Sequence, residues 1–165
     1  MTADNVELRT VTMQGCPLDL LHRARQHGEA LVRELAFIVD GGGDNTELPK
    51  RLLDVVERVR VRAGGLNTGA ERAIDEALAR GAECIDFEVV MPTALGRGAP
   101  AFAALLDEID VYCRSGDLLT LETPADVRAF QRWYLDEMAH QLDGAPPTPW
   151  AEWRRARGAR GATRS

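Results

Sequence analysis

The sequence predicts an α+β domain that is mostly helical, with about five helices around two or three short strands. Three observations support this prediction. Apolar residues recur every three or four positions in several long segments, residues 83–91 alternate between apolar and polar side chains, and Gly or Pro residues separate the segments. The chain has 165 residues, 45% of them hydrophobic, which is enough for one full-sized core. We therefore expect a single globular domain over residues 1–150. The alternative is an all-α bundle in which the strand candidates are extended loops.

The expected helices are amphipathic segments bounded by turn or capping residues. The first opens at Cys16-Pro17 and ends near Asp40, before three consecutive glycines. A later helix begins at Thr68, which has the spacing of a capping box with Glu71 and precedes a stop at Gly81. The remaining segments with helical spacing are 49–63, 101–115 and 124–142.

The strand candidates are shorter and differ in strength. Residues 83–91, ECIDFEVVM, alternate cleanly, whereas the alternation in residues 5–13 slips by one position. Residues 118–121, LLTL, form an apolar run that is long enough for a brief strand. Directly after it, Thr123 is a good N-cap and Pro124 suits the first helical position, so the last long helix should start there.

One stretch is ambiguous. Residues 93–100, TALGRGAP, could be a loop or the kinked first turn of a helix. Thr93 can cap a helix, but Gly96, Gly98 and Pro100 disfavour one. The helix is clear only from Ala101, so its start stays open.

The charge is unevenly distributed along the chain. The formal net charge is -6, but residues 151–165 carry five arginines and one glutamate, so that stretch is +4 and the rest is -10. An acidic body disfavours nucleic-acid binding, because contact with phosphates needs a basic surface. The arginine-rich tail is the exception, since it could contact an acidic partner or nucleic acid. Its Gly and Arg content and its lack of apolar periodicity predict a disordered C-terminus.

The compartment is predicted from the absence of a secretory pattern and of a membrane-spanning run, and from the three cysteines. The polar, acidic N-terminus has no secretory pattern, and no apolar run approaches the roughly 18 residues of a membrane span. Cys16, Cys84 and Cys113 are odd in number and far apart, which favours reduced thiols over a disulfide framework. We expect a cytoplasmic protein, with Cys113 as a buried, inert thiol.

The sequence lacks the common catalytic and metal-binding motifs. His22 and His27 are five positions apart, about 140° around a helix, so they do not share a face. There is no CxxC, P-loop, GxSxG or GxGxxG after a strand. We therefore predict no catalytic residue, no metal and no cofactor. The alternative is a metal-dependent or small-molecule enzyme that uses an acidic cluster on the last two long helices: Asp107, Glu108, Asp110, Asp136 and Glu137, with His140.

The candidate partner-binding residues lie near the C-terminal end of the domain. Trp133 is one position away from the apolar stripe of its helix, and Asp136 and Glu137 follow it. Trp150 comes after a proline-rich segment, and we expect it to fold back onto the body. The alternative for that segment is an exposed docking peptide. Trp133, Asp136, Glu137 and Trp150 are thus the predicted partner surface, although a purely structural role for the aromatic residues is favoured.

Four segments carry a resemblance to a known family. Two of them are LHRARQHGEALVRELAFIV (21–39) and LPKRLLDVVERVRVRAGG (48–65), and the other two are more specific. LLDEIDVYCRSGDLLTLETP (105–124) and FQRWYLDEMAHQLDGAPPTPW (130–150) resemble a family of small actinobacterial proteins that is associated with ATP-binding anti-sigma-factor regulators and stress signalling. The resemblance spans about residues 15–150. It implies a regulatory role and a protein partner, such as an ATP-binding anti-sigma regulator, and it assigns no catalytic or ligand residue. We therefore expect a non-catalytic regulatory protein, acting in sigma-factor partner switching or stress signalling.

Overall fold

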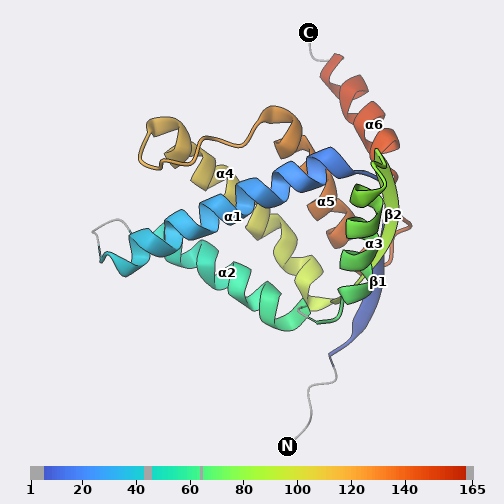
Figure 1. Ribbon diagram of the computed structural model, residues 1–165, viewed down its shortest axis with the longest axis horizontal. Helices are drawn as coiled ribbons and strands as arrows, with labels where there is room; N and C mark the ends of the chain where they lie inside the picture. The colour runs from blue at the N-terminus through green and yellow to red at the C-terminus, as the bar shows by residue number, and fades with distance from the viewer. Residues whose placement is uncertain (1–5, 43–45, 64, 163–165) are drawn as a thin grey trace, which may run out of the picture.

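The computed structural model describes residues 6–42, 46–63 and 65–162, and this part of the chain forms six helices and one two-stranded sheet (Figure 1). The predicted class, a mostly helical α+β domain, is confirmed. No helix in these ranges is both long and apolar enough to span a membrane. In chain order the elements are β1 (Leu8–Pro17), α1 (Leu18–Asp40), α2 (Glu47–Ala63), α3 (Thr68–Ala79), β2 (Cys84–Pro92), α4 (Ala94–Ser115), α5 (Ala125–Leu142) and α6 (Trp150–Ala162).

The sheet is antiparallel and packs its apolar face into the domain. Val11 pairs with Val89 and Met13 with Phe87, and all four side chains are buried. This is the alternation predicted for residues 83–91. β1 runs further than predicted, to Pro17, because a bulge at Gly15 lets the strand continue: this glycine has φ +61, and its N–H donates to an Asp86 carboxylate oxygen at 2.6 Å.

The helices enclose two separate groups of buried apolar side chains. The sheet-side cluster joins β1, β2, α3 and α5 with the start of α1 and α6. The helix-side cluster joins the second half of α1 with α2 and α4. α1 has 23 residues and is therefore about 35 Å long. It spans both clusters, with Leu18 and Leu21 in the first and Leu31 and Leu35 in the second.

The start of α4 settles the ambiguous stretch in favour of a helix. α4 begins at Ala94 and contains Pro100, so the expectation of a clear helix only from Ala101 was too short. The physical reason is tight packing on α5. A Cβ placed on Gly96 would lie 2.9 Å from the Cβ of Leu142, so only glycine permits this approach.

Two other element predictions are wrong. Residues 118–121 form no strand, and the last long helix is followed by a sixth helix where a disordered tail was predicted for residues 151–165. α6 covers that tail up to Ala162, and residues 163–165 lie outside the described part.

The helix is anchored by Trp150, which is buried, and by Trp153, whose ring stacks on it at 5.7 Å. Arg154 and Arg157 lie over these two rings one turn later.

Both predicted threonine caps differ from the structure, although the helices begin close to the expected places. The residue before α3 is Asn67, whose side chain bonds the backbone of Val90 on β2, and Thr68 already lies inside the helix. Thr123 precedes Pro124, the residue that caps α5, and makes no capping bond to that helix. Its side chain instead contacts α1 and α4, as described next.

Candidate functional site

The candidate site is the connection between α4 and α5, residues 116–124, called the α4–α5 loop below. It begins at Gly116, which has φ +80 and ends α4 as predicted. Glu34 on α1 holds its middle, because the two carboxylate oxygens accept the backbone N–H groups of Leu119 and Thr120. These residues are 85 and 86 positions apart in sequence. The anchor therefore depends on the tertiary fold.

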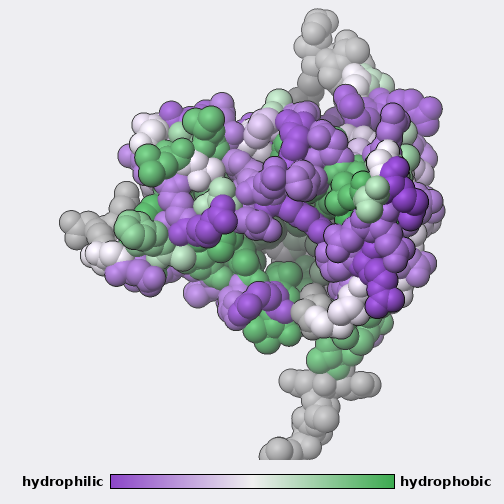
Figure 2. All heavy atoms as spheres, viewed as in Figure 1, coloured by the Kyte–Doolittle hydropathy of each residue, from purple (hydrophilic) through white to green (hydrophobic). Residues whose placement is uncertain are grey.

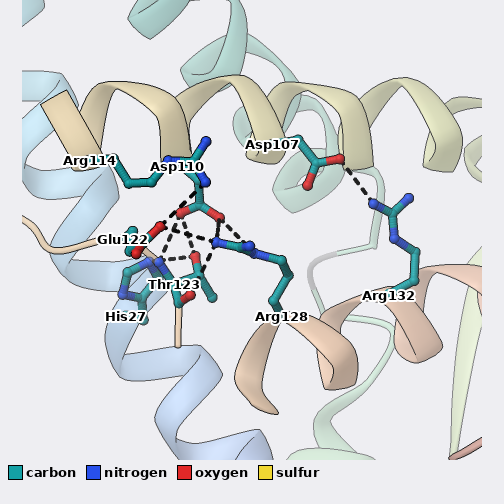
Figure 3. Close-up of polar contacts among 8 residues, drawn as sticks. All are labelled: His27, Asp107, Asp110, Arg114, Glu122, Thr123, Arg128 and Arg132. Carbon is teal, nitrogen blue, oxygen red and sulfur yellow. Dashed lines mark hydrogen bonds and ion pairs between the residues drawn. The ribbon is translucent and has the colours of Figure 1, made fainter. Parts of the chain in front are cut away.

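A second carboxylate holds the end of the loop (Figure 3). Asp110 on α4 is only 4% exposed, and one of its oxygens accepts both the Thr123 N–H at 2.9 Å and the Thr123 hydroxyl at 2.8 Å. The other oxygen accepts the guanidinium of Arg128 from α5, at 3.0 Å. Asp110 thus joins α4, the loop and the first turn of α5, and its negative charge is balanced by an arginine.

His27 on α1 completes this network. Its Nε2 lies 3.0 Å from the Thr123 hydroxyl oxygen. Because the single hydroxyl proton is donated to Asp110, which can only accept, the imidazole must donate from Nε2. Burial lowers the pKa of His27, although the nearby Asp110 charge opposes this. The ring is therefore favoured in its neutral, Nε2-protonated form.

The remaining charges near the loop are paired at the surface. Glu122 lies 3.5 Å from Arg114 and 3.6 Å from Arg128, and Asp107 accepts from Arg132 at 3.0 Å (Figure 3). At Glu34, burial opposes ionisation, but the hydrogen bonds from Thr120 and Leu119 outweigh it and lower its pKa. Glu34 is therefore held as a carboxylate, which is the form that accepts the loop's N–H groups.

The network has no room for a substrate. The cavity beside Asp110 and Arg128 has a volume of about 10 Å³, which is space for one water molecule at most. Thr123 is itself buried. A threonine between a histidine and an aspartate could suggest a nucleophile, but here the aspartate is already bound to an arginine and the hydroxyl faces the interior. The arrangement fixes the backbone of the loop.

What the loop displays is apolar. Leu119 is 94% exposed and Leu121 is 80% exposed. In Figure 2, hydrophobic spheres project at the upper left, over the α4–α5 loop of Figure 1. On the flanking helices, Val111 is exposed on α4 and Phe37 is exposed on α1, one turn beyond Glu34. A rigid loop with two solvent-facing leucines is therefore the best candidate for a binding surface.

The predicted partner surface lies elsewhere, and most of it is internal. Trp133 is fully buried, and its indole N–H donates to the Thr148 carbonyl at 3.0 Å. Glu137 is 1% exposed and accepts the Thr148 N–H at 2.9 Å and the Gln141 amide at 2.7 Å. Within this structure a partner cannot reach either side chain. Both residues bind the segment 143–149 to α5.

Trp150 and Asp136 belong to the same structural unit. Trp150 is 9% exposed and packs edge-on against Trp133 at 5.5 Å, so it folds back onto the body as predicted. Asp136 accepts from the Trp153 indole at 3.3 Å. The aromatic residues therefore seal the domain. The arginines of α6 (154, 155, 157 and 160) are exposed, and their contact with an acidic partner or nucleic acid stays a prediction.

The acidic residues of the enzyme alternative are not brought together. Glu108 faces Arg51 on α2, His140 is exposed, and the other four acids make the separate contacts given above. Across the described residues, no group of three or more His, Cys, Asp or Glu side chains could hold a metal ion. This geometry gives the enzyme alternative no common centre.

Two of the three cysteines are packing residues. Cys16 and Cys113 are buried and Cys84 is exposed, and all three are free thiols. Burial raises the pKa of Cys113 to about 11 and that of Cys16 to about 12. Both thiols are therefore protonated at neutral pH and poor nucleophiles.

Comparison with protein-family models, curated proteins and solved structures gave no match to this chain. The resemblance to actinobacterial stress-signalling proteins therefore stays a prediction.

The sequence contained part of the signal for the α4–α5 loop. The run LLTL, bounded by Gly116-Asp117 and Thr123-Pro124, predicts an ordered segment at this place, but as a strand, whereas the structure has a loop. Nothing local identifies Glu34 or His27 as its anchors, because the contacts are long-range.

Proposed function

We propose that the protein is a non-catalytic regulatory protein that binds a protein partner through the α4–α5 loop. The observation that carries this proposal is the exposure of Leu119 and Leu121 on a backbone held by Glu34 and Asp110. Burial of two leucine side chains favours association by roughly 3–6 kcal/mol. Because the loop is already ordered, little of this is lost to ordering on binding.

The apolar side chains of the loop indicate the chemistry of the partner, because most of the charges around them are paired. Of the six carboxylates in residues 107–126, Asp110 is buried, and Asp107, Glu108, Glu122 and Asp126 each pair with an arginine. The partner should therefore offer an apolar pocket that accepts Leu119 and Leu121.

The resemblance supports a more specific assignment. Its most distinctive portion, LLDEIDVYCR followed by LLTLETP, contains the α4–α5 loop and the Asp110 anchor. We place the protein in sigma-factor partner switching or stress signalling in the cytoplasm, with an ATP-binding anti-sigma regulator as its partner.

Isothermal titration calorimetry against purified ATP-binding anti-sigma regulators from the same genome tests this assignment. The double variant Leu119→Ser/Leu121→Ser should weaken binding by about a hundredfold or more, since loss of 3 kcal/mol or above corresponds to that factor. A matched control, Leu66→Ser/Leu78→Ser, changes two leucines that are 42% and 41% exposed on other surfaces and should bind as the wild type does. Equal binding by both double variants contradicts the proposed docking surface.

A second experiment separates the surface from the identity of the partner. A photo-crosslinking amino acid placed at position 119 should capture the partner in cells, whereas the same group at position 66 should not. Capture of another protein at position 119 overturns the anti-sigma assignment and keeps the loop as the docking surface. Capture at position 66 but not at 119 rejects the loop itself.

A further inference from the structure

A cavity of about 410 Å³ lies between α2, α4 and α5, and it is separate from the α4–α5 loop. Its walls are apolar apart from Arg58. Val55 and Val56 line it from α2, Phe102 and Leu105 from α4, and Leu135 and Met138 from α5. The volume is within the range of small-molecule sites, about 300–1,000 Å³.

The cavity lies where the two apolar clusters meet. Val56 and Phe102 pack against the helix-side cluster, and Met138 packs against the sheet-side cluster. The first half of α4 contributes mainly small residues to the wall, and a Cβ placed on Gly98 would have no neighbour within 4 Å. The small side chains that made this stretch ambiguous in the sequence therefore leave open space between the helices.

Arg58 supplies the single charge of the lining. It is exposed, and it has no carboxylate partner within the described parts of the chain, whereas Arg60, two residues later, is paired with Glu57 at 2.9 Å. An unpaired guanidinium beside an apolar cavity suits a ligand that has a carboxylate at one end and a hydrocarbon body.

We propose that this cavity binds an amphipathic monocarboxylate of the medium-chain fatty-acid type. The hydrocarbon chain lies in the cavity between α2, α4 and α5, and the carboxylate pairs with Arg58 on α2. This site goes beyond the partner-binding function, because no residue of the α4–α5 loop lines it.

The methionines offer a direct test by methyl NMR, with decanoate as the probe. Met91 and Met138 line the cavity, whereas Met13 is buried in the sheet-side cluster and does not. Decanoate below its micellar concentration should shift the methyl resonances of Met91 and Met138 in a saturable way and leave Met13 unchanged. Shifts that are absent, or equal at all three methionines, overturn the proposal.

Ligand and protein variants test the two halves of the site. Decanol lacks the carboxylate and should bind about tenfold more weakly than decanoate. Arg58→Ala should remove that difference, while Arg58→Lys keeps most of it.

Gly98→Leu should fill the cavity and prevent binding, whereas Gly158→Leu changes an exposed helical glycine and should not prevent binding. An unchanged Met13 resonance reports that each variant is folded. Equal affinities for decanoate and decanol in the wild type contradict the role of Arg58, and decanoate binding by Gly98→Leu contradicts the location.

Discussion

The two segments that flank α5 both have a backbone anchored by carboxylate side chains. One of them leads into a buried side chain, and the other exposes its side chains to solvent. In the segment 143–149, Glu137 accepts the Thr148 N–H, and the chain continues into the buried Trp150. In the α4–α5 loop, Glu34 and Asp110 accept three backbone N–H groups, and the chain presents Leu119 and Leu121 to solvent. A carboxylate fixes the backbone in both places.

This difference shows that anchoring the backbone and burying the side chains are separate properties. Burying one leucine stabilises a fold by roughly 1.5–3 kcal/mol, and the α4–α5 loop leaves that stabilisation unused at two positions. The segment 143–149 uses its anchor to complete the core. The loop uses its anchors to keep an apolar surface available, which is the basis of the proposed partner binding.

The largest expected effect is at Glu137. Glu137→Ala should lower the free energy of unfolding by about 2–4 kcal/mol, because the buried donors of Thr148 and Gln141 lose their acceptor. Urea unfolding followed by tryptophan fluorescence measures this. Asp136→Ala, one residue earlier and partly exposed, should change stability by less than about 1 kcal/mol. Similar losses in both variants contradict the structural role of the Glu137 anchor.

A smaller loss is expected at the corresponding anchor of the loop. Asp110→Ala should cost about 1–3 kcal/mol, since it leaves the Thr123 N–H and hydroxyl without their acceptor and removes the shorter of the two ion pairs of Arg128. It should also accelerate hydrogen exchange at the Thr123 amide. Asp107→Ala removes only an exposed pair with Arg132 and should cost about 0–1 kcal/mol. A loss at Asp107 as large as that at Asp110 would show that exposure does not distinguish the two acids.

The loop anchor should also respond to pH through His27. Burial lowers the pKa of His27 in the folded state, while the unfolded chain has a value near 6.5. As the pH falls below about 6.5, the unfolded state takes up a proton that the folded state resists, so stability decreases until the folded pKa is passed. His27→Gln should reduce this dependence between pH 7.5 and 5.5 in urea unfolding. The control His140→Gln changes an exposed histidine and should keep the pH dependence of the wild type. If His27→Gln also keeps the full pH dependence, then His27 is not its source.

The smallest effect on stability is expected where the effect on binding is largest. Leu119→Ser/Leu121→Ser should change the free energy of unfolding by no more than about 0.5 kcal/mol, because neither side chain is buried. Thermal unfolding by circular dichroism checks this. A loss above about 1.5 kcal/mol would show that these leucines support the fold, which is incompatible with a surface reserved for a partner.

Much of the fold followed from the sequence because the signals were local. The apolar spacing of α1 and the alternation in β2 are properties of neighbouring residues, and both elements were predicted within a few positions. The start of α4 was not predicted, because it depends on the packing of Gly96 against Leu142, which is 46 positions away in sequence. α6 was missed because its stability comes from tryptophan packing and not from helical periodicity.

The candidate site was only partly predictable for the same reason. Thr123 correctly marks where α5 begins, but its side chain does not cap the helix. The hydroxyl contacts Asp110 and His27 instead. Trp133 lies off the apolar stripe of α5 when that helix is considered alone. It becomes the most deeply buried aromatic residue once the segment 143–149 covers it.

Amide hydrogen exchange at Leu119 and Thr120 tests most directly whether the α4–α5 loop is held in place with its leucines outward. Both N–H groups donate to Glu34, so in the wild type they should exchange more slowly than an unstructured chain. Glu34→Ala should remove that protection, and Glu29→Ala, an exposed acid on the same helix, should not. Exchange at the unprotected rate in the wild type would contradict a pre-ordered binding loop.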